Sequence, residues 1–346
     1  MVHRAETDLS AAATPPLAAF DPRRFLAVLE SDWFRLVVAL QDRISQLTVE
    51  LWSRSGLKTL HLPITTSAIS SPLGLGSDSK PVEIDLYGVK TYLADSMQFM
   101  LEYGCRLCPS GCYYIMPSFR GEAPDATHLC QFYHSEIEVP GGLDPLLDTV
   151  EGYLRHLAAG LLSTHTDDLR RLAGGVEHLE RMAGSASFAR LTFDEAAAFL
   201  RHDSQLVLTG DGTWRTLSRA GERRLLAQVA EPLWVTQWDH LAVPFYQAFV
   251  DGTGAQARNA DLLLGQGEVI GAGERHTDGA TTMRALALHQ VSAEPYAWYV
   301  DLKTHFPLVT SGFGMGIERF LLWVLRHDDI RDLQILPRVN GLALVP

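Results

Sequence analysis

The chain has 346 residues, 47% of them apolar and 20% charged, with a formal net charge of −12. This composition is ordinary for a globular protein with one large domain or two small ones. The acidic balance argues against a large nucleic-acid surface, because phosphate contacts need clustered Lys and Arg, although an acidic enzyme can still hold a nucleotide in a local basic pocket. No apolar run reaches the roughly 18 residues of a membrane helix, and the N-terminus lacks a signal-peptide centre. We therefore expect a cytoplasmic protein, with no membrane partner and a disordered N-terminus at residues 1–20.

The first half of the chain predicts two helices, a short strand and a hairpin. Apolar residues at helical spacing predict a helix over residues 31–54, then a short strand around LHLPI (60–64) and a second helix after Ser96. The runs YYIMPSF (113–119) and FYHSEIEV (132–139), joined by a polar loop, are typical of a β-hairpin. The Gly and Ser content of SSPLGLGSDSK suits a mobile lid.

The second half predicts a charged helical stretch followed by strands. Residues 145–230 predict a helical insertion. Strands are predicted at PLWVTQW (232–238), YQAFV (246–250), DLLLGQGEVIGAGER (261–275) and YAWYVDLK (296–303). Because strands and helices come in blocks, the pattern favours an α+β fold with an antiparallel sheet flanked by helices over a parallel βαβ fold.

The loop of the predicted hairpin carries a first group of chemically active side chains. Arg120 ends one strand, Glu122 follows, His128 lies in the loop and Phe132 begins the return strand. A guanidinium can bind two phosphate oxygens at once, a carboxylate can accept from an exocyclic amine, and an aromatic ring can stack over the group that they hold. The simpler alternative is a surface salt bridge on a hairpin.

Two glycine-rich stretches carry further charges. In EVIGAGER, Glu268 offers a carboxylate that could bind Mg²⁺ together with phosphates. In SGFGMGIERF (311–320) a glycine-rich turn is expected to lead into a helix, with Arg319 in its first turn, where the helix dipole disfavours a cation. The GxGxG spacing fits neither the dinucleotide fingerprint nor a Walker loop. Taken alone, a solvated arginine beside a turn is the simpler interpretation.

These stretches, in order from about residue 25 to 340, resemble the catalytic domain of class II aminoacyl-tRNA synthetases, in the asparaginyl/aspartyl branch. The helix over 31–54 with LHLPI is similar to the family's first motif, FRGE with ATHLCQF to the second, and GFGMGIERF to the third. YLADSMQFMLE, FARLTFDEA, GEVIGAGER, YAWYVDLK and DDIRDLQILPR are similar to asparaginyl enzymes. The resemblance implies one catalytic domain over residues 21–346, an antiparallel sheet flanked by helices, and a homodimer formed through the first motif.

The resemblance also implies a site for ATP, bent over the sheet, and for Mg²⁺. Its residues would be Arg120, His128 and Arg319 for the phosphates, Glu122 and Phe132 for the adenine, Glu268 for the metal, and Gly314 and Gly316 for an open pocket floor. Attack of a carboxylate on the α-phosphate needs positioning and charge neutralisation, which two arginines and a metal ion supply. We therefore expect Arg120 and Arg319 to be catalytic.

For the amino-acid substrate, the resemblance implies that Ser96, Gln98 and Glu136 hold the ammonium and backbone, and Lys303 the remaining carboxylate. Lys303 stands where the family pattern has Arg, and an Arg-to-Lys change is not conservative at a bidentate site. Leu101 stands where aspartyl enzymes carry a Lys. Gln131 and Glu274 also depart from the pattern, and only some 25 residues precede the matching region, where the family has an anticodon-binding barrel.

These departures favour an enzyme that transfers its acyl-adenylate to an acceptor other than tRNA. The resemblance extends to free-standing relatives that act as AMP-forming asparagine synthetases, and it implies an amide ligase of that type. It would adenylate a carboxylate of aspartate or a related amino acid and transfer it to ammonia or a small amine. Two alternatives stay open. One is a truncated asparaginyl-tRNA synthetase that still charges tRNA, which the missing barrel disfavours. The other is a catalytically silent paralogue, against which the joint presence of Arg120, Glu268 and Arg319 argues.

Overall fold

The structure is a computed structural model that describes residues 23–71 and 80–338. The expected disordered N-terminus at residues 1–20 lies outside these ranges, as do residues 72–79, which form most of the expected lid. Within the described ranges, no helix is both long enough and apolar enough to cross a membrane.

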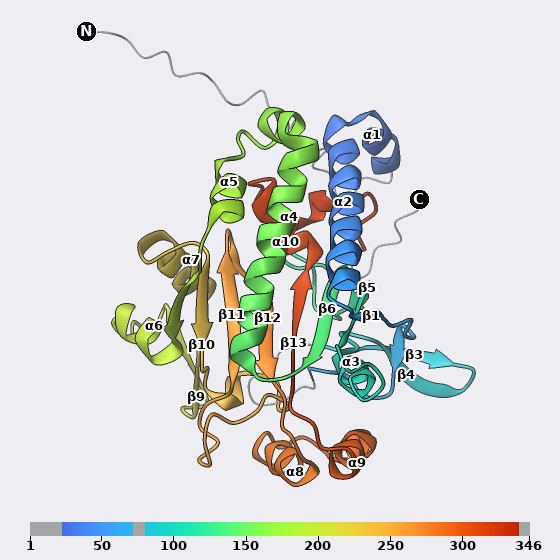
Figure 1. Ribbon diagram of the computed structural model, residues 1–346, viewed down its shortest axis with the longest axis vertical. Coiled ribbons are helices and arrows are strands. Elements are labelled where there is room, and N and C mark those ends of the chain that lie inside the picture. Colours follow the sequence, from blue (N-terminus) through green and yellow to red (C-terminus); the bar gives the residue numbers. More distant parts are fainter. Residues whose placement is uncertain (1–22, 72–79, 339–346) are drawn as a thin grey trace.

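A mixed, mostly antiparallel sheet forms the centre of the molecule (Figure 1). In spatial order its described strands are β1 (Lys58–Thr59), β5 (Cys112–Phe119), β6 (Gln131–Pro140), β13 (Thr310–Gly316), β12 (Gly267–Glu274), β11 (Asn259–Leu264), β10 (Leu233–Thr236) and β7 (Ala189–Thr192). Only the two edge pairs, β1 with β5 and β10 with β7, run parallel. The predicted α+β class with an antiparallel sheet is therefore confirmed.

Two long helices, α2 (Asp32–Arg54) and α4 (Leu143–Leu172), lie side by side on one face of this sheet (Figure 1). Between them and the strands lies the largest hydrophobic core, in which Trp52 and Tyr153 pack on Phe313 of β13. The other described helices are α1 (Arg24–Glu30), α3 (Gln98–Gly104), α5 (Glu177–Gly184), α6 (Phe193–Phe199), α7 (Arg219–Gln228), α8 (Gly279–Leu288), α9 (Ala297–His305), α10 (Ile317–Val324) and the 3₁₀ turns His240–Ala242, Glu294–Tyr296 and Ile330–Leu333.

The period-two alternation of the strands separates the core from the opposite face. On β6 and β13, Ile137, Phe313 and Met315 belong to the helix-covered core. The intervening residues on β6 are His134, Glu136 and Glu138, and each pairs directly with a glycine of β13. One face of the sheet is thus apolar, whereas the other carries ionisable groups opposite residues without side chains.

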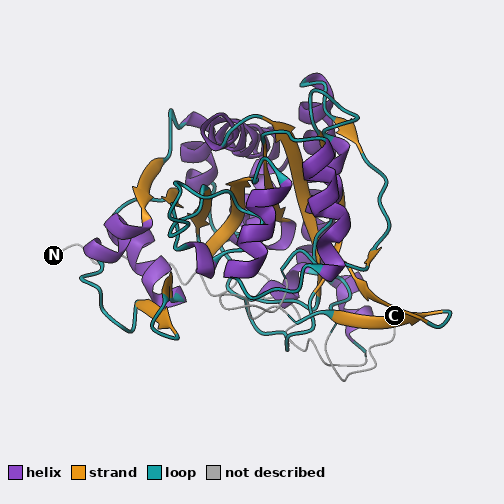
Figure 2. Cartoon of the chain, turned by 90° about the horizontal axis from the view of Figure 1, so that it is seen from below, coloured by secondary structure: helices purple, strands orange, loops and turns teal. Residues whose placement is uncertain are grey.

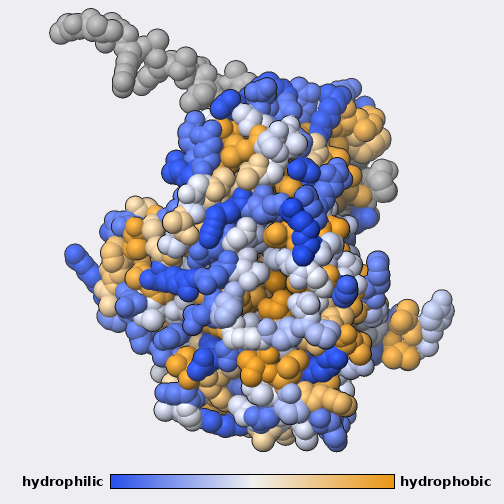
Figure 3. Space-filling model, in the orientation of Figure 1, coloured by the Kyte–Doolittle hydropathy of each residue, from blue (hydrophilic) through white to orange (hydrophobic). Residues whose placement is uncertain are grey.

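A smaller hairpin projects from the body of the molecule (Figure 1, Figure 2). It consists of β3 (Val82–Leu86) and β4 (Val89–Leu93), and β2 (Thr65–Thr66) pairs with β4. Its tip exposes Leu86, Tyr87 and Val89, and apolar side chains on it are visible in the space-filling view (Figure 3). A further hairpin, β8 (Val207–Gly210) with β9 (Trp214–Leu217), lies outside the main sheet.

Several local predictions were wrong. YAWYVDLK forms helix α9, because Tyr296, Tyr299 and Leu302 occur at helical spacing and are buried together. The glycines of SGFGMGIERF lie in strand β13, and the expected helix, α10, begins directly after it. YQAFV makes only isolated bridges, and the short strand near LHLPI is two residues earlier, at β1. The region 145–230 contains helices, but also β7, which joins the main sheet, and β8 with β9.

Candidate active site

The floor of a cavity of about 570 Å³ is formed where β6 and β13 pair. Gly314 and Gly316 both line it. A Cβ atom on Gly314 would lie 2.9 Å from Glu136 Oε1, so a larger residue would push into the carboxylate. Glycine at this position therefore keeps the polar face of β6 accessible.

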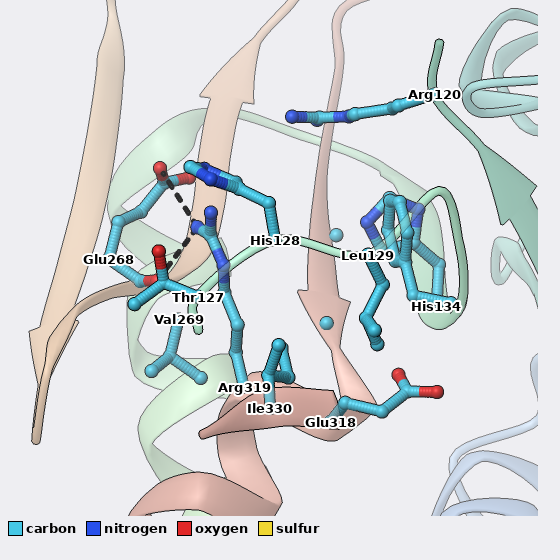
Figure 4. A pocket seen from close by; sticks show the side chains of 13 residues that line it. Arg120, Thr127, His128, Leu129, His134, Glu268, Val269, Glu318, Arg319 and Ile330 are labelled. Atoms are coloured by element: carbon cyan, nitrogen blue, oxygen red, sulfur yellow. Dashed lines mark hydrogen bonds and ion pairs between the residues drawn. The ribbon is translucent and has the colours of Figure 1, made fainter. Parts of the chain in front are cut away.

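Arg319 and Glu268 meet at one side of this cavity (Figure 4). Arg319 lies in the first turn of α10, and its Nη1 atom donates to the Glu268 carbonyl at 3.0 Å and lies 3.5 Å from the Glu268 carboxylate. Both side chains stay partly exposed, at 29% and 42%. The cation that the helix dipole disfavours is thus turned into the cavity beside a carboxylate.

Arg120 enters from the opposite side, just past the end of β5 (Figure 4). Its guanidinium carbon is 5.6 Å from the ring centre of Phe132, which begins β6. Its Nε atom is buried and makes no hydrogen bond within the described part of the chain. The two arginines that the sequence singled out therefore face one space. Glu122 is directed elsewhere, because its Oε1 accepts the backbone N–H of Lys80 at 2.8 Å.

His128 lies on the hairpin loop between these groups and contacts an arginine that the sequence analysis missed. Arg219, the first residue of α7, places Nη2 2.7 Å from His128 Nε2, while His128 Nδ1 is 3.2 Å from Asp125. Burial lowers the pKa of His128, and the charges of Arg319 and Arg219 lower it further, whereas Asp125 opposes them. Neutral His128 can thus accept from Arg219 at one nitrogen and donate to Asp125 at the other.

An acidic group faces these cations. An ideal Cβ on Gly271 would lie 3.2 Å from Glu268 Oε1 and 3.8 Å from Asp261 Oδ1, so the two carboxylates flank the same glycine. Burial raises the pKa of Asp261 well above its ordinary value, and the charges of Glu268 and Glu222 raise it further. Within the described residues, no group of three or more His, Cys, Asp or Glu side chains is arranged to hold a metal ion. A pair of carboxylates at this spacing does fit a cation completed by phosphate oxygens, as Mg²⁺ usually is.

Beyond the glycine floor lies a buried polar group around Glu136. Ser96 donates to Glu136 Oε2 at 2.7 Å, the Tyr114 hydroxyl donates to the same oxygen, and His134 Nδ1 is 3.1 Å from Oε1. Burial alone would raise the pKa of Glu136, but the charge of His134 and these hydrogen bonds outweigh it and lower the pKa. The structure thus brings Ser96 and Glu136 together as the resemblance implied.

Gln98 belongs to a neighbouring network that also contains a second missed residue, Arg275. Gln98 Nε2 donates to Glu138 Oε2 at 2.5 Å, and Arg275 Nη2 donates to the same oxygen at 3.1 Å. Glu138 and Arg275 are both almost fully buried. Gln98 is therefore connected through one carboxylate to a guanidinium.

Lys303 does not line the cavities described here; it is wholly buried in an ion pair. Its ammonium lies 2.5 Å from Glu102 Oε1 and also donates to the His276 carbonyl. Burial lowers its pKa, against the opposing effect of Glu102. The other departures also have structural partners: Glu274 Oε2 accepts the Leu143 N–H at the start of α4, at 3.1 Å, and the Gln131 carbonyl accepts from Gln334 at 3.0 Å.

Comparison with known proteins agrees with this architecture. The family described as "tRNA synthetases class II (D, K and N)" matches residues 22–340. The asparagine–tRNA ligase of Thermoplasma acidophilum is 26% identical over 317 residues, which cover 90% of this chain and 70% of the relative. That of Lactobacillus delbrueckii is 26% identical over 307 residues, covering 88% and 68%.

Solved structures give the same fold. The asparaginyl-tRNA synthetase from Pyrococcus horikoshii complexed with asparaginyl-adenylate superposes with a TM-score of 0.84 at 21% identity, covering 94% of this chain and 73% of that one. The aspartyl-tRNA synthetase from Entamoeba histolytica gives 0.75 at 18% identity, covering 94% and 62%. The fold is therefore that of the class II catalytic core. With a family match across almost its whole length, the chain belongs to the class II tRNA synthetases of the aspartyl, lysyl and asparaginyl group, and is a ligase by family.

Proposed function

We propose that this protein activates an amino acid of the aspartate or asparagine type with ATP, forming an aminoacyl-adenylate and pyrophosphate. The observation that carries the proposal is the convergence of Arg120 and Arg319 on one cavity whose glycine floor leads to the buried carboxylate of Glu136. An anionic tail would meet the arginines, and an ammonium group would meet Glu136. The carboxylate oxygen attacks the α-phosphorus, and the bond to the β-phosphate oxygen breaks as pyrophosphate leaves.

Each end of the cavity contributes positioning and charge. Arg120 binds the α-phosphate, His128 and Arg319 the phosphates beyond it, and Phe132 the adenine ring. Glu122 is no longer assigned to the adenine amine, because its carboxylate accepts from the Lys80 N–H. Asp261 and Glu268 would hold Mg²⁺, which supplies positive charge to the phosphate oxygens. This chemistry needs no strong acid or base, only fixed donors around developing charge.

At the amino-acid end, Ser96 and Glu136 bind the ammonium group and Gln98 the backbone. Arg275 replaces Lys303 in our assignment of the cation nearest the substrate side chain. It is joined to Gln98 through Glu138, whereas Lys303 is held by Glu102. The Nε and Nη2 atoms of Arg275 already donate to Glu138 and Nη1 donates to Gln247, so a substrate carboxylate or amide oxygen would be met by the second N–H of Nη1 and of Nη2.

For the acceptor, the reported relatives favour tRNA, because they are named asparagine–tRNA ligases. The departures from the family pattern that favoured ammonia as acceptor are weaker arguments once the contacts of these residues are known. Lys303 and Glu274 make structural contacts, so neither requires a different acceptor. Transfer to ammonia or a small amine is kept as the second outcome of the experiment below.

A homodimer is part of the proposal. Helix α2 exposes Val38 and Val49, and Val38 lines a groove of about 1100 Å³ together with Tyr133 and Ile335. A second copy of the chain would cover this apolar surface. Sedimentation of the purified protein tests it, and a monomer at micromolar concentration would contradict it.

Amino-acid-dependent exchange between ATP and pyrophosphate tests the activation step. We expect exchange with aspartate or asparagine, and AMP release that rises on addition of tRNA. AMP release that rises with ammonia instead would establish the amide ligase. Absence of exchange with every one of the twenty amino acids would overturn activation.

A further inference from the structure

A third guanidinium reaches the phosphate end of the cleft from outside the three sequence motifs. Arg219 begins α7, in the stretch 145–230 to which the sequence assigned no chemistry. The Ser218 side chain caps this helix by accepting the Gly221 N–H at 3.1 Å, which fixes where the helix starts. Arg219 thereby lines a cavity of about 1000 Å³ together with Arg120, His128 and Arg319.

The hydrogen bonds of Arg219 involve no carboxylate. Within the described residues its hydrogen bonds go to the Thr127 hydroxyl and to the ring nitrogens of His128, at 2.7 and 2.8 Å, and neither partner is anionic. Arg215, four residues earlier and also partly buried, shows the usual arrangement, because it pairs with Asp194 and Asp239 at 2.8 and 2.7 Å. A partly buried guanidinium whose hydrogen-bond partners are all neutral can donate to an anion that enters the cavity.

The charges that line this cavity indicate which kind of anion would bind there. Arg120, Arg219 and Arg319 converge from three elements on one cavity, with the carboxylates of Glu222 and Glu268 in its wall. A single carboxylate would not balance three guanidiniums, whereas a pyrophosphate unit offers several charged oxygens and can share a divalent cation with Glu268. Adenine and ribose carry no comparable charge.

We propose that Arg219 binds the β- and γ-phosphates of ATP and the pyrophosphate that leaves. The inference rests on the proposed function of the same cleft. Arg219 belongs to the region 145–230 and not to a sequence motif. It also holds the loop that carries Thr127 and His128 in place against α7.

The competing explanation is that Arg219 only tethers this loop. Two substitutions separate the roles. Thr127→Val weakens the tether, because it removes the hydroxyl that contacts Arg219 and Asp125, but it keeps the cation. Arg219→Gln removes the charge. Arg224→Gln is the matched control, since Arg224 is an exposed arginine on the same helix. Arg219→Lys keeps a charge but loses the planar donor pair.

The experiment is calorimetric titration of ATP, pyrophosphate and AMP, with Mg²⁺, at one ionic strength. We expect Arg219→Gln to bind ATP and pyrophosphate roughly tenfold to a hundredfold more weakly, because a charge-assisted contact is lost. AMP affinity should change by less than about twofold, and Arg219→Lys should be intermediate. Thr127→Val and Arg224→Gln should bind ATP within about threefold of the unaltered protein.

Equal pyrophosphate affinity in Arg219→Gln and the unaltered protein would overturn the inference and leave amino-acid activation intact. Weaker binding in Thr127→Val, equal to that in Arg219→Gln, would also overturn it in favour of the tether. Pyrophosphate binding that depends on Arg219, without any amino-acid-dependent exchange, would support the inference while the proposed function fails.

Discussion

The two ends of the cavity hold their charges in opposite ways. At the phosphate end, Arg319 and Glu268 remain partly exposed and Arg219 has only neutral partners. At the amino-acid end, Glu138 with Arg275 and Glu102 with Lys303 are nearly or wholly buried and satisfy each other. The side chains of the open end are therefore free to meet a charged ligand, whereas the ion pairs of the buried end are formed before any ligand arrives. Substitutions at the open phosphate end should accordingly lower ligand binding and reaction rate. Substitutions at the buried amino-acid end should lower the stability of the fold.

The largest expected effect is on stability at the buried end. Arg275→Met leaves the carboxylate of Glu138 buried without a cation, which should lower the free energy of unfolding by about 3–5 kcal/mol. Urea denaturation at fixed protein concentration measures it. Arg54→Met removes an exposed pair with Glu50 and should cost less than about 1 kcal/mol. Equal losses of unfolding free energy in Arg275→Met and Arg54→Met would contradict a special role of the buried end in stability.

At the open end, the expected effect is on rate and not on stability. Arg120→Gln and Arg319→Gln should each lower amino-acid-dependent exchange by roughly 10²–10³, or about 2.7–4 kcal/mol of transition-state stabilisation. Their urea midpoints should match that of the unaltered protein. A marked loss of stability in either variant would show that these arginines belong with the buried group.

Acid should damage the buried end first. His276 directly follows Arg275, its ring packs near that of His240, and His240 Nδ1 lies 2.8 Å from His289 Nε2. Burial lowers the pKa of His240 to about 4 and those of His276 and His289 to about 3. Because these values lie below the ordinary 6.5, the histidines contribute stability that is complete above pH 6.5 and is lost as the pH falls toward 4. Each should contribute a loss of about 2 kcal/mol between pH 6.5 and 5.

Unfolding curves across this window check the effect in His289→Gln, which keeps a polar group beside His240 but cannot take up the proton. We expect the slope of stability against pH to fall by about one proton. The exposed His305 serves as control, and His305→Gln should leave the slope as it is. An unchanged slope in His289→Gln would contradict the assignment of the buried end as acid-labile.

The smallest expected effect is at the boundary between the two ends. Gly314→Ala places a methyl group against Glu136 and should weaken ATP and amino-acid binding roughly tenfold, since overpacking costs about 1–3 kcal/mol. Gly252→Ala is the control, because a Cβ there meets no atom within 4 Å. Equal weakening of ligand binding by Gly314→Ala and Gly252→Ala would mean that the space above Gly314 does not determine the affinity for ATP or the amino acid.

The fold class could be predicted from the sequence, and so could the candidate residues that lie within the motifs. Strands β5 and β6 could be assigned from two apolar-rich runs joined by a polar loop, and the residues Arg120, Glu268 and Arg319 lie within stretches that resemble family motifs. Helix α9 was misassigned because its aromatic run also fits a strand, and only packing with Phe99 and Phe245 decides for the helix.

The missed residues share a physical reason. Asp261 lies in the apolar run DLLL, and only the pairing of Asp261 with Gly271 brings it beside Glu268. Arg219 lies more than 90 residues from His128, so their contact is invisible in any local window. Arg275 directly follows the noted Glu274, and its role depends on burial beside Glu138. Local patterns predict elements, but contacts between distant elements need the assembled sheet.

The pairing of β6 with β13 has a consequence for how the protein is made. Pro140 pairs with Thr310, 170 residues further along (310 − 140). During translation, β6 can pair with β5 early, but its other edge has no partner until β13 has left the ribosome. Such long-range pairing slows folding, and an unpaired edge strand is a template for aggregation. The central seam of the sheet, on which both halves of the cavity depend, is therefore among the last to close in a nascent chain, and yield of active protein should depend on chaperones acting in that interval.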